Sequence, residues 1–519
     1  MFDFDKSSKK SCYITLFLIS LLAIVLFRTA WVSDDAYITM RTVDNFVNGH
    51  GLVYNLGERV QSYTHPLWLF VITGVYGLTH NAYWSLISVS LFLTLLMAII
   101  FARRIARNQY AVIFGIAAML LSKSFIDFST SGLENPLTYL LIVIFVIAYM
   151  TPVVNLKKLF VVSLIAAIAA LNRLDLILLF LPGTIFTLWE TWRDVPTNQR
   201  KKVLLTFVVS FFPLIMWLSF SLLYYGFIFP NTAYAKLHTG VPEKLLVRQG
   251  AAYFISLLDF DPVTLLVIVL GIGVTLLSRN IQKWALAIGI GLYLGYIIYI
   301  GGDFMDGRFF TAPFLLAVIL ISQSDIVASW QTLALSLGAL IIVGLMSPHP
   351  SLLSNGSYGK DVDIFDVRGV ADERAFYYPT TGLLRYCRDC KLPGHKWVND
   401  GLAAKESEQY AIPVESIGFI GFYAGSKKYI TDASGLADPL LARLPIPDKN
   451  EWRIGHFRRK WPDGYIETLA SGVNQIKDSQ LAEFYDHLTV ITREPIFDRQ
   501  RLLTIWKMNT GQYDYLLPK

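Results

Sequence analysis

Charged side chains are scarce in this sequence: they make up 16% of its 519 residues, while 54% are hydrophobic and 14% are aromatic. With a mean hydropathy of +0.47, this composition excludes an ordinary soluble globule and indicates an integral membrane protein. No block of basic residues with interleaved aromatics is present, which excludes a nucleic-acid surface. The formal net charge of +6 arises entirely before residue 347, as expected of cytoplasmic loops that follow the positive-inside bias.

Cysteine is rarer still, with three residues in the chain, which excludes a disulfide-rich scaffold. Cys387 and Cys390 form a C-R-D-C pair. We expect a small-loop disulfide if this part lies outside the cytoplasm, with free thiols as the alternative. His395 adds a third possible metal ligand, but a structural zinc site takes four. No metal site is therefore predicted there.

Motifs for nucleotides and for hydrolysis are also absent, since the sequence has no P-loop, HExxH or Ser-His-Asp elbow. Gly418, Gly421 and Gly425 do not have the spacing of a dinucleotide fingerprint, so no cofactor is expected there. Residues 412–432 instead predict a strand, a glycine-rich turn with a short helix, and a second strand. We interpret 347–519, whose composition is that of a soluble protein, as a small α/β domain.

Long apolar runs, in contrast, are abundant, and many approach the length that crosses a bilayer. Lysines before the first run predict a cytoplasmic N-terminus, and basic loops between later runs fit the same orientation. Eleven spans are predicted, which puts 347–519 on the outer side and makes 1–346 a transmembrane domain. The spans are 11–32, 83–102, 110–125, 136–151, 158–172, 175–191, 203–225, 262–278, 283–300, 311–323 and 327–346.

The first outer loop, residues 33–82, begins with two adjacent carboxylates, Asp34 and Asp35. An amphipathic helix is predicted to follow them and to lie on the membrane surface, and a second helix is predicted over 67–79. Acids at a membrane exit are costly unless they bind or deprotonate something polar. The alternative is structural: with Ser33 as N-cap, the two acids would only complement the helix dipole.

Other polar clusters fall on the same predicted side of the membrane, whereas the inner loops carry only simple basic residues. This one-sided distribution indicates an outward-facing site. Trp31, Trp68 and Trp84 are expected in an interfacial aromatic belt. The outer clusters are Asp127 with 131–136, then 172–175, 224–238 and 301–308.

Several of these segments together resemble the GT-C class of polytopic glycosyltransferases, which use polyprenyl-phosphate-linked sugars. Within that class the chain resembles the mycobacterial terminal β-(1→2)-arabinofuranosyltransferase and the ZomB/LphB-like inner-membrane proteins, one of which is known for flagellar motor control. The match spans nearly the full length. The segments that carry it are 34–41 (DDAYITMR), 49–60 (GHGLVYNLGERV), 130–134 (TSGLE), 230–236 (PNTAYAK), 301–308 (GGDFMDGR), 432–439 (DASGLADP), 453–456 (RIGH) and 462–465 (PDGY).

The resemblance implies a GT-C-like fold and a catalytic acid in the first outer loop, which here is the Asp34–Asp35 pair. We expect Asp34 to act as general base on an acceptor hydroxyl, with Asp35 orienting it or the sugar. The remaining roles are hypotheses about charge and hydrogen bonding. Donor-phosphate candidates are Arg308, Arg173, Lys236 and His238. Sugar or acceptor candidates are Glu134, Asp175, Asn231, Tyr234, Asp303, His65 and His456.

Several alternatives to these roles stay open. The pairs Arg173–Asp175 and Asp303–Arg308 could be structural ion pairs at span ends, and 172–175 (NRLD) lacks the proline that the family resemblance leads us to expect. A non-enzymatic membrane organiser or, less favoured, a transporter could replace the enzyme. No essential cofactor is expected, with a divalent cation left open. The predicted location is the bacterial inner membrane, with the C-terminal domain periplasmic and an envelope glycan, lipid or protein as acceptor.

Overall fold

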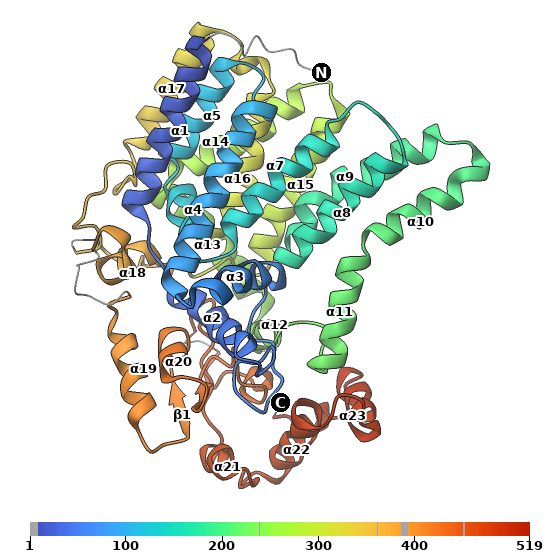
Figure 1. Cartoon of the computed structure of the whole chain (residues 1–519), viewed down its shortest axis with the longest axis vertical. Coiled ribbons are helices and arrows are strands. Elements are labelled where there is room, and N and C mark those ends of the chain that lie inside the picture. Colours follow the sequence, from blue (N-terminus) through green and yellow to red (C-terminus); the bar gives the residue numbers. More distant parts are fainter. Residues whose placement is uncertain (1–8, 238, 361, 386–392, 450–451, 519) are drawn as a thin grey trace. The chain divides into compact units, whose positions relative to one another are not determined.

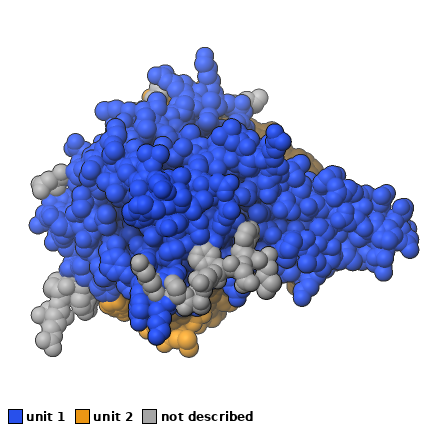
Figure 2. Space-filling model, turned by 90° about the horizontal axis from the view of Figure 1, so that it is seen from above, with its two compact units in different colours: residues 1–32, 86–214, 243–392 blue, residues 33–85, 215–242, 393–519 orange. Residues whose placement is uncertain are grey.

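The computed structural model describes residues 9–237, 239–360, 362–385, 393–449 and 452–518. The chain divides into two compact units, each assembled from three separate stretches. Unit 1 comprises residues 1–32, 86–214 and 243–392, and unit 2 comprises 33–85, 215–242 and 393–519. Figure 1 labels their elements and Figure 2 colours the two units.

Unit 1 is helical, and its centre is α16 (Thr311–Ser322), all twelve residues of which are buried. A helix that is apolar on every side belongs inside a bundle or a membrane. Glycines allow its neighbours to approach closely, since a Cβ on Gly271 would lie 2.7 Å from Ala317 Cβ. The other main helices are α1 (Lys9–Thr29), α4 (Ala82–Ile100), α5 (Gln109–Leu121), α6 (Lys123–Phe128), α7 (Asn135–Tyr149), α8 (Leu156–Asn172), α9 (Leu176–Asp194), α10 (Arg200–Ser210), α13 (Glu243–Phe260), α14 (Pro262–Leu277), α15 (Ile281–Tyr299), α17 (Trp330–Gly344) and α18 (Glu373–Thr381).

Every predicted span overlaps a helix, but few of these helices are long enough to cross a bilayer alone. Among the described residues, three helices meet that criterion: Ser11–Thr29, Ala82–Ile105 and Ile281–Tyr299. The number rises to five if two bent pairs each count as one span: α10 with α11 (Phe212–Tyr224) at 49°, and α13 with α14 at 111°. The protein is thus helical with several apolar helices, and the count of eleven spans stays a prediction.

Unit 2 combines the first predicted outer loop with the end of the chain. Its helices pack on two apolar clusters, one of which joins Ile38 and Tyr54 to Ile417 and Ile430. The elements are α2 (Asp34–Val47), α3 (Pro66–Thr79), α11 (Phe212–Tyr224), α12 (Asn231–Leu237), α19 (Lys396–Glu406), β1 (Ala411–Val414), α20 (Phe419–Ala424), β2 (Tyr429–Asp432), α21 (Tyr465–Ser471), α22 (Ser479–Arg493) and α23 (Arg499–Asn509).

The strand, short helix and strand predicted over 412–432 are present. β1 and β2 pair in parallel, with Ala411 opposite Tyr429 and Val414 opposite Asp432, and α20 forms the crossover between them. These are the only strands of the described residues, so the sheet is a two-stranded element within a helical unit. Cys387 and Cys390, and hence their disulfide, lie outside the described residues.

Several expectations differ from the structure. The predicted domain boundary at residue 346 differs from the observed division, because 347–385 packs within unit 1. The helix α13 lies between the predicted spans 203–225 and 262–278, where the sequence analysis predicts no helix. Trp31 and Trp68 are buried rather than placed in a belt, while Trp84 is 44% exposed.

The largest local difference concerns α2. Ten of its fourteen residues are buried, because it packs against α3 and α20. The predicted surface helix is therefore mostly enclosed by protein.

Candidate active site

The acidic pair opens α2, as predicted. Ser33 has extended backbone angles and its hydroxyl accepts a hydrogen bond from the Ala36 N–H at 3.4 Å. Asp34 and Asp35 occupy the first helical turn, where negative charge interacts favourably with the helix dipole. The pair differs in burial: Asp34 is 3% exposed, whereas Asp35 is partly exposed.

Both carboxylate oxygens of Asp34 accept hydrogen bonds from the loop that leads into α20. Oδ2 accepts from Ser416 Oγ at 2.9 Å and from the Gly418 N–H at 3.0 Å, and Oδ1 accepts from the Phe419 N–H at 2.6 Å. Burial raises the pKa of Asp34 to about 6, although the Phe419 N–H opposes this shift. The charge of Asp35 raises the pKa further. Asp34 therefore caps the start of α20, a role that sequence reasoning did not assign.

Two glycines make this contact possible. A Cβ on Gly418 would lie 1.8 Å from the Asp34 carbonyl oxygen, and one on Gly421 would lie 2.0 Å from Tyr54 Oη. No side chain fits at either position without displacing backbone or a buried tyrosine. Gly418 and Gly421, whose spacing does not match a dinucleotide fingerprint, thus allow α20 to approach α2 closely.

Arg41, at the other end of the same motif, fastens the far side of α20. Its guanidinium is buried and donates to the carbonyl oxygens of Tyr54 at 2.8 Å and Lys428 at 2.6 Å, and also to that of Gly421. The segment 34–41 therefore forms a bracket around α20. The Asp34 carboxylate binds the first turn of α20, and the Arg41 guanidinium binds near its last turn.

His65 lies against α2 within the same unit. Its Nε2 is 2.8 Å from Thr39 Oγ1 and its Nδ1 is 3.2 Å from Thr64 Oγ1. The imidazole is 7% exposed. Of the predicted sugar-binding residues, His65 is therefore the one that contacts α2, the helix that starts with the acidic pair.

Asn231 and Tyr234 belong to α12, and their side chains contact protein groups of the segment 435–443. Asn231 Nδ2 donates to the carbonyl oxygens of Gly435 at 2.8 Å and Asp438 at 3.0 Å, and its Oδ1 accepts from Arg443 at 3.2 Å. The Arg443 guanidinium also lies 4.8 Å from the Tyr234 ring centre. The segments 230–236 and 432–439, both part of the family resemblance, thus hold each other in place.

The basic candidates of unit 2 differ in exposure and in charge. Lys236 is exposed, while His238 lies outside the described residues. His456 is largely enclosed, and burial together with the charge of Arg453 lowers its pKa to about 4. His456, predicted as a sugar or acceptor residue, is therefore neutral near pH 7.

In unit 1 the structure brings the other predicted residues together in one ion-pair cluster. Arg308 donates to both oxygens of Glu134, at 3.1 and 3.2 Å. Arg173 reaches Glu134 Oε1 at 3.3 Å and pairs with both oxygens of Asp175, at 3.1 and 2.5 Å. Asp303 Oδ2 lies 3.7 Å from Arg308. Loops that are distant in sequence thus meet at Glu134.

Charge decides what this cluster can do. Three carboxylates face two guanidinium groups, and none of the five side chains is more than 13% exposed. A surplus of negative charge disfavours the binding of a phosphate. The arrangement therefore agrees with the structural ion-pair alternative for Arg173 and Arg308.

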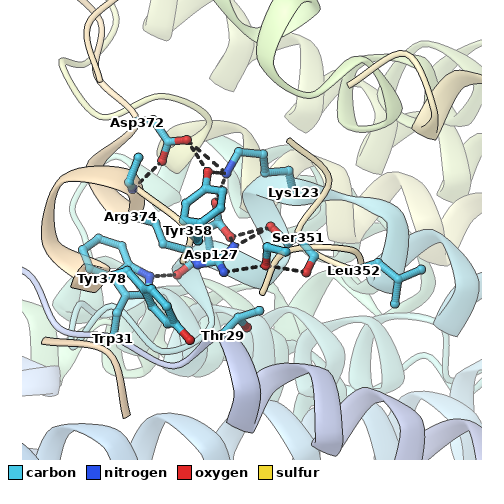
Figure 3. Close-up of polar contacts among 12 residues, drawn as sticks. Thr29, Trp31, Lys123, Asp127, Ser351, Leu352, Tyr358, Asp372, Arg374 and Tyr378 are labelled. Atoms are coloured by element: carbon cyan, nitrogen blue, oxygen red, sulfur yellow. Dashed lines mark hydrogen bonds and ion pairs between the residues drawn. The ribbon is translucent and has the colours of Figure 1, made fainter. Parts of the chain in front are cut away.

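Unit 1 also contains a second buried ion cluster (Figure 3), and of its members the sequence analysis singled out Asp127 alone. Lys123 Nζ lies 2.5 Å from Asp127 and 3.2 Å from Asp372, and Arg374 donates to Asp127 at 2.9 Å. Tyr358 accepts from Lys123 at 2.5 Å. The four charged side chains are at most 6% exposed. The only signal in the sequence is Lys123 four residues before Asp127, a helical spacing.

No protein-family model matches the chain. The terminal β-(1→2)-arabinofuranosyltransferase of Mycobacterium tuberculosis is 25% identical over 84% of this chain and 82% of the relative. The enzyme of the same name from Corynebacterium glutamicum is 25% identical over 82% of this chain and 72% of the relative. The chain is related to glycosyltransferases. The predicted resemblance to the arabinofuranosyltransferase and the predicted enzyme class, a glycosyltransferase, are thereby confirmed.

Among solved structures, ArnT from Cupriavidus metallidurans aligns with this chain in two states. The structure bound to undecaprenyl phosphate gives a TM-score of 0.43 at 12% identity, over 84% of this chain and 77% of ArnT. The apo structure gives 0.47 at 13% identity, over 82% and 87%. Both scores are low.

Proposed function

We propose that this chain is a membrane glycosyltransferase that moves a sugar from a polyprenyl-phosphate donor to an envelope glycan, lipid or protein. The similarity to two named arabinofuranosyltransferases, over more than four fifths of this chain, is the observation that carries the proposal. It also favours a pentofuranose such as arabinofuranose as the transferred sugar. The bias of basic residues towards the inner loops supports transfer on the periplasmic face of the inner membrane.

In the proposed reaction, a hydroxyl oxygen of the acceptor attacks the anomeric carbon of the donor sugar. A carboxylate takes the hydroxyl proton as the new glycosidic bond forms. The bond from the anomeric carbon to the phosphate oxygen breaks, and the lipid phosphate leaves with the bonding electrons. A positioned base contributes roughly 10²–10⁴-fold to such a step.

The geometry supports Asp35 as the base and Asp34 as its positioning residue, the reverse of the expectation from sequence. Asp34 is enclosed, and both of its oxygens already accept hydrogen bonds from the α20 loop. Asp35 sits beside it in the same helical turn and is the more exposed of the two. An acceptor hydroxyl can therefore approach Asp35 more easily than Asp34.

For the donor phosphate we propose Lys236, because it is exposed on α12 and an ammonium group stabilises the charge that develops on a leaving phosphate. Arg173 and Arg308 are proposed to order the loops around Glu134 rather than to bind phosphate directly. With a monophosphate leaving group, side-chain cations can do the work of a metal, so we propose that transfer needs no essential metal ion.

Glycan analysis of a deletion strain tests the proposal. Mass spectrometry of envelope glycans is expected to show loss of one terminal sugar, restored by the wild-type gene but not by Asp35→Asn. Two other outcomes contradict it. Unchanged glycans with a motility defect that Asp35→Asn rescues would favour a non-enzymatic membrane organiser. Unchanged glycans with impaired uptake of a solute would favour a transporter.

A further inference from the structure

The last long helix of the chain, α23, exposes an apolar face. Leu502, Leu503 and Trp506 are 41%, 53% and 66% exposed, and Phe497, just before the helix, is 79% exposed. Positions 502, 503 and 506 lie on one side of a helix because they follow the i, i+1, i+4 spacing. Large apolar side chains gathered on one exposed face mark an interaction site rather than an ordinary soluble surface.

The neighbouring helix shows what an ordinary surface of this unit looks like. α22 packs against α23 and buries Leu481, Phe484 and Leu488. Its exposed face carries Glu483 and Asp486. The apolar face of α23 therefore differs from the charged exposed face of the helix that packs against it.

A fixed attachment joins α23 to the end of α11, an apolar helix. Arg501, which is fully buried, donates to the last carbonyl oxygens of α11, at Leu223 (2.8 Å) and Tyr224 (2.9 Å). α11 itself exposes Ile215 and Met216, at 47% and 51%. With α10 it forms one of the bent helix pairs that are apolar and long enough to span a membrane. The helix α23 is thus attached to the end of a candidate span.

Basic residues lie at both ends of the exposed apolar face of α23. Arg499 precedes the apolar residues and Lys507 follows them, and both are exposed. Apolar residues flanked by basic ones are typical of helices that lie in the headgroup region, where Lys and Arg meet anionic lipids. We propose that α23, together with Phe497, lies in the headgroup–acyl boundary of the bilayer as an interfacial helix. This placement is independent of which sugar, if any, the protein transfers.

Spin labels in the full-length protein test the proposal. Leu503→Cys and, as the matched control on α22, Glu483→Cys are labelled with a nitroxide in a background where Cys12, Cys387 and Cys390 are serine. The proteins are reconstituted in nanodiscs that contain anionic lipid. The label at 503 is expected to collide with oxygen several-fold more, relative to a water-soluble nickel chelate, than the label at 483. Equal preference for the chelate at both positions would overturn the proposal.

A second measurement avoids the cysteine background. Fluorescence quenching by brominated lipids is compared between the wild-type protein and Trp506→Phe. The emission of Trp506 is the difference between the spectra of the wild-type protein and the variant, and if α23 lies in the boundary, brominated lipid quenches this difference. A difference spectrum that brominated lipid leaves unchanged would contradict an interfacial position for Trp506.

Discussion

At the scale of single residues, the two members of the acidic pair have different roles. Asp34 holds the loop that leads into α20, and Asp35 is the proposed base. Asp34 keeps three hydrogen-bond donors of the 416–419 loop satisfied while it is almost fully enclosed. Asp35, one residue on, keeps contact with solvent. Similar side chains side by side thus acquire different environments, and the environment sets what each carboxylate can do.

Asp34→Asn is expected to loosen the α20 loop. An amide offers one acceptor oxygen, so the donors that faced the other oxygen become unsatisfied, at a cost of about 1–3 kcal/mol for each buried group. Limited proteolysis in detergent should then cut the variant faster within 416–425 than the wild-type protein. Asp35→Asn is the matched control and should be cut at the wild-type rate. Equal protection of all three proteins would contradict the capping role.

The pKa of Asp34 gives a pH prediction with a definite sign. Because burial raises this pKa from 3.8 to about 6, the folded protein binds a proton that the unfolded chain has released between these values. Stability from this group is therefore fully present below about pH 4 and is lost as pH rises through about 6. The thermal midpoint of the wild-type protein, minus that of Asp34→Asn, should rise between pH 7 and pH 5. A difference that stays constant would refute the raised pKa.

At the scale of elements, α2 is a bracket around α20, and part of this arrangement could be predicted from the sequence. The N-cap Ser33, the start of α2 at the acidic pair and the strand–helix–strand over 412–432 follow from local patterns. The burial of α2 did not follow, because its polar residues Arg41 and Asn45 pair with backbone carbonyl oxygens that local periodicity does not reveal. Long-range partners decide the burial of polar side chains, and a single sequence does not name them.

Arg41→Lys tests the bracket directly. A lysine keeps the charge but loses the planar fork that reaches several carbonyl oxygens at once, so unsatisfied buried carbonyl groups remain. We expect destabilisation of about 2 kcal/mol or more, seen as a lower thermal midpoint. Lys427→Arg, which alters an exposed side chain in the same loop, should leave the midpoint within error. A wild-type midpoint for Arg41→Lys would argue against the bracket.

At the scale of the whole molecule, two buried ion clusters connect distant parts of unit 1. The cluster in Figure 3 ties α6 to the segment 347–385, which explains why that segment belongs to the helical unit. The sequence indicated a boundary near 346, since the polarity of the chain changes there. Polarity alone, however, does not show which unit a polar segment packs against.

Asp127→Asn is expected to destabilise the membrane protein strongly. It removes the shared partner of Lys123 and Arg374 inside the protein, and breaking a buried pair costs about 3–5 kcal/mol. The yield of monodisperse protein after detergent extraction should fall sharply. Asp325→Asn breaks the Arg107–Asp325 pair, whose side chains are 42% and 88% exposed, and should change the yield little because surface pairs contribute about 0–1 kcal/mol. Similar yields for the two variants would contradict the structural role.

The central claim is tested most directly by sugar transfer in vitro from a polyprenyl-phosphate pentofuranose to an envelope-glycan acceptor. The purified wild-type protein should form the glycosylated product, and Asp35→Asn should slow its formation by roughly 10²–10⁴-fold while keeping the wild-type thermal midpoint. Product formation by Asp35→Asn at the wild-type rate would contradict the assignment of the base. The absence of any product with the wild-type protein across polyprenyl-phosphate sugars would contradict the proposed function itself.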